Sequence, residues 1–168
     1  MSSENRPPGR GKAAVITLGA IVAVAAVAAI VLGMQRLSGA DPVQRRDDIR
    51  AAATQEATNL LAADYRKAQS VSDHILSGAT GQFRDEWAGT GGKAFVDAIT
   101  KAQSVGAVQS VVVGVVSADA TSAEVMVAAN STVTMPQVPA GTLRTARWSM
   151  NLEKVGGRWL VSKMALVP

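Results

Sequence analysis

Residues 13–34 contain no charged side chain, and this uncharged run constrains the chain more than any other feature. A helix of this length would extend about 33 Å, which is enough to cross a hydrocarbon core of roughly 30 Å. The sequence therefore predicts one transmembrane helix over residues 13–34. We expect residues 1–12, which are rich in proline and glycine, to form a disordered tail. Residues 35–40 would be a linker, and residues 41–168 a separate domain outside the cytoplasm.

A cleavable secretory signal is the alternative interpretation of the same run. Ser38, Gly39 and Ala40 place small residues before Asp41, where a signal peptidase would cut. The apolar core of an ordinary signal peptide is only about 7–15 residues long, so the length favours an uncleaved anchor. Basic residues flank both ends of the run, and their number does not decide the orientation.

Small residues recur every four positions inside the run. Such spacing lets two membrane helices approach closely, although an alanine-rich segment also produces it by chance. The predicted packing face consists of Gly19, Ala23, Ala25, Ala29 and Gly33.

The distribution of charge argues against nucleic-acid binding. The formal net charge is +4, of which residues 1–40 carry most, so residues 41–168 are nearly neutral. A nearly neutral domain has no basic surface that could follow phosphates. The chain has no cysteine and one histidine, which excludes disulfides, thiol nucleophiles and sites with several histidines. We therefore expect no metal, no cofactor and no nucleic-acid partner.

The first part of the domain has helical patterns. Asp41 and Pro42 are good start signals, and Gln44 occupies the position of a capping-box partner. Apolar and small residues recur with helical spacing, which predicts a helix over residues 41–69. Its inner stripe would be Ile49, Ala53, Ala57, Leu60, Leu61, Asp64 and Ala68.

Three shorter helices should follow. The first would run from Ser70 and end at Gly78, the second would contain Phe83 and Trp87, and the third would span residues 94–102. A loop is expected between the last two, because the second should stop at the first of several glycines. These glycines do not follow a strand and lack a Walker lysine-serine pair, so no phosphate site is predicted; they are Gly89, Gly91 and Gly92.

The second part of the domain has strand patterns. Alternation in the third strand places apolar residues on one side only, which is typical of a sheet covered on one face. The fold class is therefore α+β, with helices on one face of a curved four-stranded antiparallel sheet. The expected strands are residues 107–117, 123–135, 143–155 and 158–166.

Two turns connect the later strands. Pro136 and Pro139 should frame a short loop after the second strand. Gly156-Gly157 predicts a tight hairpin, because both positions can take a positive φ. A two-residue turn there puts Leu152 opposite Val161 and Trp148 opposite Ala165.

Three stretches carry a resemblance to a known family. They read LLAADYRKAQSVSDHILSGATGQFRDEW, VVVGVVSADATSAEVMVAANSTV and WSMNLEKVGGRWLVSKMALV, and they follow one N-terminal span. In this order they resemble the Mce-associated membrane proteins of mycobacteria and related actinobacteria (Mce stands for mammalian cell entry). The resemblance runs from the predicted span to Pro168.

The resemblance implies a fold, a location and a function. The outer domain would be a cone similar to cystatin and nuclear transport factor 2. The N-terminus would lie in the cytoplasm, and the cone in the periplasm or cell envelope. The chain would be a non-enzymatic accessory subunit of an Mce-type importer of sterols or fatty acids, acting through contacts with the transporter's protein subunits. The family has no agreed catalytic residues, so none is assigned here.

The residues themselves give little support for catalysis. His74 beside Asp73 could form an oriented base, but no nucleophile accompanies the pair, and we expect an ordinary helix residue. An isomerase-type site needs a carboxylate base and an oxyanion donor. Tyr65 is the one phenol, while Glu124 and Glu153 should point away from the apolar face. The tryptophans are expected to pack rather than to bind a ligand; they are Trp87, Trp148 and Trp159.

Two other functions stay open from the sequence. The domain could be a membrane-tethered module that binds lipid or sterol, with or without isomerase-like chemistry. It could also be an assembly factor of an apparatus like type IV secretion, whose subunits share a short tail, one span and a cone. A cavity with a carboxylate near Tyr65 would favour the lipid-binding module. An interior filled by Met126, Trp148 and Met150 would leave no room for a ligand.

Overall fold

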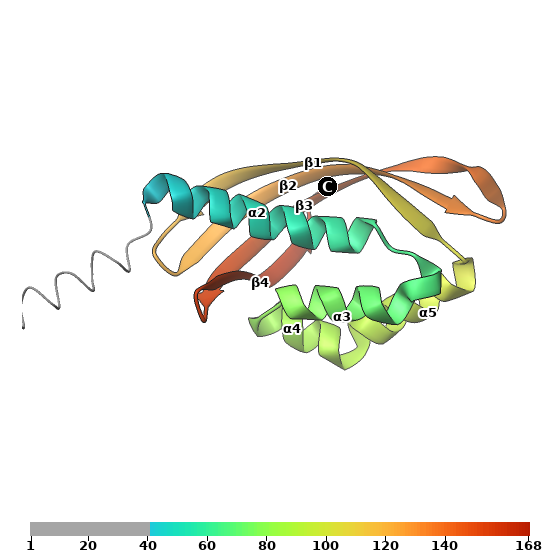
Figure 1. The fold of residues 1–168 in the computed structure, drawn as a ribbon, viewed down its shortest axis with the longest axis horizontal. Coiled ribbons are helices and arrows are strands. Elements are labelled where there is room, and N and C mark those ends of the chain that lie inside the picture. Colours follow the sequence, from blue (N-terminus) through green and yellow to red (C-terminus); the bar gives the residue numbers. More distant parts are fainter. Residues whose placement is uncertain (1–40) are drawn as a thin grey trace, which may run out of the picture. The chain divides into compact units, whose positions relative to one another are not determined.

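Helices pack on one face of a four-stranded antiparallel sheet, as the computed structural model shows for residues 41–168, the range that the structure describes (Figure 1). This confirms the predicted α+β architecture. The predicted tail, span and linker lie outside the described residues, as does the proposed packing face of Gly19, Ala23, Ala25, Ala29 and Gly33. No helix within the described range is long and apolar enough to span a membrane.

Helix α2 (Pro42–Leu61) begins as predicted. The backbone N–H of Val43 donates to the Asp41 carboxylate at 3.1 Å, and proline occupies the first turn. The capping-box prediction is wrong, because the Gln44 side chain donates to Asp48 at 3.1 Å instead.

The predicted continuation of this helix to residue 69 is also wrong. The α-helix ends at Leu61, and Asp64 caps a new 3₁₀ turn, η1 (Tyr65–Lys67), by accepting from the Arg66 N–H at 2.9 Å. A short side chain that satisfies the backbone locally favours a new start over continuation. Asp64 and Ala68 therefore do not belong to the inner stripe of α2.

Three helices follow, α3 (Ala68–Gly78), α4 (Gly81–Glu86) and α5 (Gly92–Ala102). The expected glycine loop before α5 is wrong, since Trp87–Gly91 forms a wide π-helical turn, η2. A Cβ on Gly92 would lie 2.9 Å from the Trp87 carbonyl oxygen, so glycine permits this close turn.

The sheet is an antiparallel meander in the order β1-β2-β3-β4. Its strands are β1 (Val105–Ala118), β2 (Ser122–Met135), β3 (Val138–Val155) and β4 (Arg158–Leu166). The expected loop around the two prolines is shorter than predicted. Met135 pairs with Val138 across a two-residue turn, and Pro139 already belongs to β3.

The final hairpin confirms one predicted pairing and corrects the other. Gly156 and Gly157 both have positive φ, and Leu152 faces Val161 as expected. Trp148 faces Leu166 rather than Ala165. The cause is a β-bulge, because Ser162 is an extra residue in β4, which shifts every later pair by one position.

The core lies between the helices and the inner face of the sheet. α2 contributes Ile49 and Ala53 to it, and β2 and β3 contribute Val125 and Met150, all of which are fully buried. The small alanine side chains of α2 allow the helix to lie close to the sheet. This arrangement confirms that the sheet is covered by helices on one face.

Candidate interaction surface

The outer face of the sheet carries no helix in the described part of the chain. Successive residues of a strand point to opposite faces, so β2 separates its side chains cleanly. Val125 and Val127 are buried beneath the helices, whereas Met126 and Ala128 are exposed on the outer face. The condition set for a filled interior is met only in part, because Trp148 and Met150 lie in the core while Met126 does not.

Two rows of mostly small or apolar residues cross the centre of this outer face, and Arg147 is the one charged residue in them. Strand pairing aligns them across neighbouring strands, and most have side chains too short to project far. Val112 is 66% exposed and Met126 38% exposed, so apolar surface is open to solvent. We call these rows the outer patch, which consists of Val112, Gly114, Met126, Ala128, Arg147, Ser149 and Ala165.

Polar residues border the outer patch. On one side the Thr145 hydroxyl donates to the Asn130 side-chain oxygen at 2.9 Å. On the other side the pairings place Glu124 and Lys163 on either side of Asn151 in a single row. A partly apolar centre with a polar border is the usual composition of a protein–protein interface, and arginine and methionine are enriched there.

His74 and Asp73 are both exposed on α3, as expected for ordinary helix residues. The Asp73 carboxylate accepts a hydrogen bond from the Gln69 side chain at 2.9 Å. His74 therefore lies on the solvated surface of the helix, while Asp73 lies beside the groove formed by α3 and α5.

The structure does not bring Tyr65 together with the strand carboxylates. Tyr65 lines a shallow depression with Thr134 and Met135, at one end of the sheet. Glu124 lies ten positions before Thr134 on the same strand, which corresponds to about 33 Å. Glu124 and Glu153 occupy outer-face positions, as predicted. An oxyanion site made from these residues is thus excluded by distance.

The tryptophans serve packing, as predicted. Trp148 and Trp159 are buried. The Trp87 indole N–H donates to the Ser72 hydroxyl at 3.0 Å, and its ring lies 5.2 Å from the Phe95 ring. These contacts hold α3, η2 and α5 together.

A groove of about 440 Å³ lies where α3, η2 and α5 meet. Its lining is mixed, with apolar side chains beside polar ones, and the Lys93 ammonium and Asp97 carboxylate form an ion pair at 2.6 Å. The size is within the range of small-molecule sites. The lining includes Ser72, Leu76, Trp87, Lys93, Val96 and Asp97.

Glu56 is a buried carboxyl group that the sequence analysis missed. It is 2% exposed, its Oε1 has no hydrogen-bond partner, and its Oε2 lies where a Cβ on Gly78 would be. Burial raises the pKa of Glu56 to about 8, and a side-chain hydrogen bond with Asn59 lowers it by less. The group is therefore mostly protonated and neutral at pH 7. Glu56 follows Ala53 of the inner stripe by three residues, and this helical spacing is the sequence signal that could have placed Glu56 in the core.

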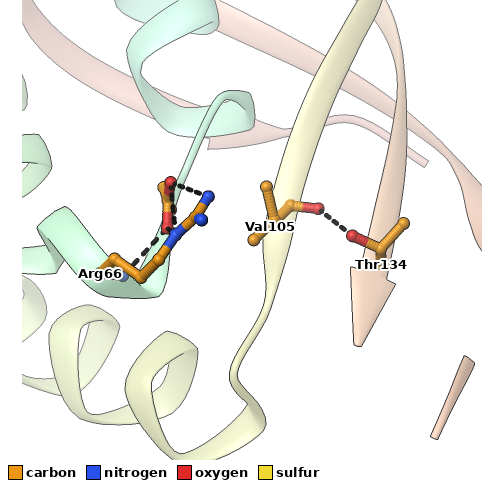
Figure 2. Close-up of polar contacts among 4 residues, drawn as sticks. Arg66, Val105 and Thr134 are labelled. Atoms are coloured by element: carbon orange, nitrogen blue, oxygen red, sulfur yellow. Dashed lines mark hydrogen bonds and ion pairs between the residues drawn. The ribbon is translucent and has the colours of Figure 1, made fainter. Parts of the chain in front are cut away.

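An exposed ion pair marks the junction between the helices and β1. The Arg66 guanidinium donates to the Asp64 carboxylate at 2.7 Å, while the Thr134 hydroxyl donates to the Val105 carbonyl at 3.3 Å (Figure 2). The hydrogen bonds from Arg66 lower the pKa of Asp64 to about 2. Asp64 also pairs with Val105 in an isolated antiparallel bridge, so this junction joins η1 to the start of the sheet.

Solved structures share this fold at low sequence identity. An IcmL-like type IV secretion system protein from Legionella pneumophila aligns with a TM-score of 0.58 at 12% identity, covering 77% of this chain and 94% of that one. The periplasmic domain of DotI aligns with a TM-score of 0.58 at 12% identity, covering 77% and 97%. An NTF-2 like protein from Shewanella oneidensis is a weaker match, with a TM-score of 0.37 at 12% identity over 68% of this chain and 98% of that one.

The IcmL-like and DotI structures show a shared fold. Identity this low carries no information about activity. The sequence has no significant match among curated proteins. A family model extends over nearly the whole chain, from the predicted span through the last strand. It is described as "Uncharacterized protein Rv1363c/MT1408-like" and matches residues 11–168, so the chain belongs to the Rv1363c/MT1408-like family.

Proposed function

We propose that this chain is a non-enzymatic accessory subunit of an envelope membrane complex, and that it binds partner subunits through the outer patch. The observation that carries the proposal is the uncovered sheet face, whose centre consists mostly of small and apolar residues with one exposed arginine, Arg147, and whose border is polar. Exposed apolar surface of this kind is typical of sites for protein contacts. The uncharged run at residues 13–34 supports attachment to the membrane. The envelope side for the domain rests on the sequence resemblance.

The complex that we favour is an Mce-type lipid importer. This choice rests on the sequence resemblance to Mce-associated proteins, and the outer patch supplies a surface through which permease or substrate-binding subunits could be held. In this role the domain stabilises its partners and performs no chemistry on the lipid.

The test is purification of the tagged full-length protein from its native membranes in mild detergent, followed by mass spectrometry. Ala128→Arg places a long charged side chain in the centre of the outer patch. Ala51→Arg is the matched control, because it introduces the same residue at an exposed position of α2.

We expect Mce subunits to accompany the wild-type protein and the Ala51→Arg control, and to be reduced at least tenfold with Ala128→Arg. Retention of the same subunits by Ala128→Arg would contradict the role of the outer patch. Co-purification of secretion subunits in place of Mce subunits would overturn the importer assignment. That result would support an assembly role, which the shared fold with the IcmL-like and DotI domains favours as the next candidate.

A lipid-binding module is the remaining candidate, and the groove between α3 and α5 is the observation that favours it. Lipid extraction and mass spectrometry of the purified protein would test it. A stoichiometric lipid that is lost on Val96→Arg, a change in the groove lining, would support lipid binding and argue against a purely structural role.

A further inference from the structure

One edge of the sheet presents a row of unsatisfied backbone groups. β1 pairs with β2 on one side only. On its other side the Gly106 N–H donates to the Ala63 carbonyl at 2.7 Å, and the Tyr65 N–H donates to the Ser104 carbonyl at 3.1 Å, so the loop after α2 closes the first positions. Within the described range, residues 107–118 have no backbone partner on that side.

This edge lacks the features that usually protect exposed strands. Edge strands are commonly protected by charged residues, prolines or bulges. Residues 102–118 contain no charged residue and no proline. Bulges occur at Gln109 and Val116, but the stretch 110–115 between them is regular. An ordinary strand has about 5–6 residues, so this stretch is long enough to pair with another strand.

We propose that residues 110–115 pair antiparallel with the same stretch of a second copy of this chain, centred on Val112, so that two sheets become one continuous sheet. Antiparallel pairing of one strand with itself has two-fold symmetry, and each copy uses the same surface. Residues that face each other then point to the same face of the sheet. Val112 meets Val112 of the second copy, Val111 meets Val113, and Ser110 meets Gly114.

Charge and side-chain size favour a second copy as the occupant. Two identical surfaces bring identical charges together, and a charged strand would repel itself. The neutral stretch 110–115 avoids this repulsion, and its valines and small residues face groups of similar chemistry in the antiparallel copy. Val112 is 66% exposed in a single copy, and the valine opposite it would cover part of that surface.

The association should be weak without a membrane. One strand pair buries less area than a standard interface. Anchoring by the predicted helix at residues 13–34 would confine the copies to one plane and raise their local concentration. The experiments therefore use the full chain in membranes or mild detergent.

A cysteine cross-link measures the geometry directly. The chain has no cysteine, so Val112→Cys supplies the sole thiol. Edge pairing places the two cysteines across from each other at about 4.5–5.5 Å between Cα atoms, which is within disulfide range. Ala128→Cys is the control, since Ala128 faces Val112 from β2 on the same face. The two copies of residue 128 would lie three strand spacings apart, about 14 Å, which is beyond disulfide range.

Oxidation in native membranes should give a disulfide-linked dimer with Val112→Cys, at twice the 17.3 kDa of one chain, and at least tenfold less with Ala128→Cys. Absence of the dimer from both variants would overturn the proposal. Equal cross-linking of both would also overturn it, because that result indicates stacking of two outer faces.

Lysine variants separate this edge from other causes of association. Val112→Lys should weaken the dimer at least tenfold by light scattering in mild detergent, and Ala128→Lys should leave it unchanged. Circular dichroism verifies the fold of both. A dimer that survives Val112→Lys would overturn the proposal and implicate another segment. The wild type could instead be a monomer that co-purifies with a different protein chain. If Val112→Lys then loses that chain, the edge binds a partner's strand, and the proposal of a second copy is overturned. Val112 belongs to both the outer patch and the edge, whereas Ala128 belongs to the outer patch alone. Loss of Mce subunits with Ala128→Arg therefore tests the proposed function, and the Val112→Cys cross-link tests the dimer, so the two proposals fail separately.

Discussion

The two edges of the sheet differ in how they are closed. At the β4 edge, the Thr80 N–H donates to the Val161 carbonyl at 2.8 Å, and Ala79 forms a parallel bridge with Val161. β4 is also short, contains charged residues and has a bulge at Ser162. The β1 edge is longer and uncharged, and most of it has no backbone partner in the described range.

This difference separates folding from association. The segment that closes the β4 edge continues directly from Gly78, which contacts the buried Glu56, so this edge is part of the monomer's core. Changes there should alter the free energy of unfolding. Val112 on the open edge is exposed, whereas its neighbours Val111 and Val113 pack against the core. Changes to Val112 should therefore alter binding to another chain and leave unfolding almost unaffected.

The largest expected effect is the pH dependence of stability caused by Glu56. The pKa is about 8 in the folded state and about 4.5 for an ordinary glutamate. The folded protein therefore holds this proton more tightly, and the contribution to stability is fully present below pH 4.5. It is lost as pH rises from 4.5 to 8, by up to about 4–5 kcal/mol in the free energy of unfolding.

Glu56→Gln removes this titration. In urea unfolding, the free energy of unfolding of the variant should rise relative to that of the wild type between pH 4.5 and 8. The difference between the two free energies should stay constant at higher pH. Asp73→Asn, on the exposed surface of α3, is the control and should not change the curve. Parallel pH profiles for the wild type and Glu56→Gln would contradict a buried neutral carboxyl.

Opening the closed edge should have the next largest effect. Thr80→Pro removes the N–H that donates to Val161 and requires a φ near −65°, whereas Thr80 has a φ of −144°. We expect the free energy of unfolding to fall by about 3 kcal/mol. Thr80→Ala keeps the N–H and should cost about 1 kcal/mol or less. If both variants were equally stable in urea, the edge contact would not contribute to folding.

Neighbouring residues on β2 provide a reference between the two edges. Val127→Ala opens space in the core and should lower the free energy of unfolding by about 2 kcal/mol. Met126→Ala removes a side chain from the outer patch and should change it by less than about 0.5 kcal/mol. Similar losses for both, measured by chemical denaturation, would mean that the outer face is covered in the folded protein.

The smallest effect concerns the ion pair between Asp64 and Arg66, which lies where the loop after α2 covers the first residues of β1. Arg66→Ala removes the donor that lowers the pKa of Asp64, and this pKa should return from about 2 toward its ordinary value of 3.8. The contribution of the pair to stability is present above pH 3.8 and is lost as pH falls toward 2. Carboxyl-carbon NMR measures the pKa directly. Lys67→Ala, a weaker influence on Asp64, should shift it less, and the opposite order would contradict the role of Arg66.

Local signals predicted the strands and their order well. The alternation in the strand segments and the Gly156-Gly157 turn gave the meander and the Leu152–Val161 pair. The start of α2 also followed from its cap. These features depend on neighbouring residues, so a single sequence carries them.

The errors arose where distant contacts or local competition decide the structure. The bulge at Ser162 lies beside the point where Thr80 docks on β4, and that contact is not visible in the β4 sequence. The end of α2 depends on whether Asp64 continues this helix or caps η1, and the structure shows that it caps η1. At the candidate site, the alternation of β2 correctly separated Val125 and Val127 from Met126. Glu56 was missed because a glutamate is rarely fully buried, so nothing in its own residue type marks it as part of the core.

The order of the helices and strands has a consequence for synthesis on the ribosome. All the helices precede β1, so about 60 residues of sheet are still to be made when α5 is complete. At about 5–20 residues per second, the helices would wait several seconds for the surface they cover. The side of α2 that waits is mostly alanine, with Ile49 as its one large fully buried apolar side chain. The large apolar side chains that await the sheet lie mainly on the later helices, such as Ile75 of α3 and Phe83 of α4, which are made shortly before the strands.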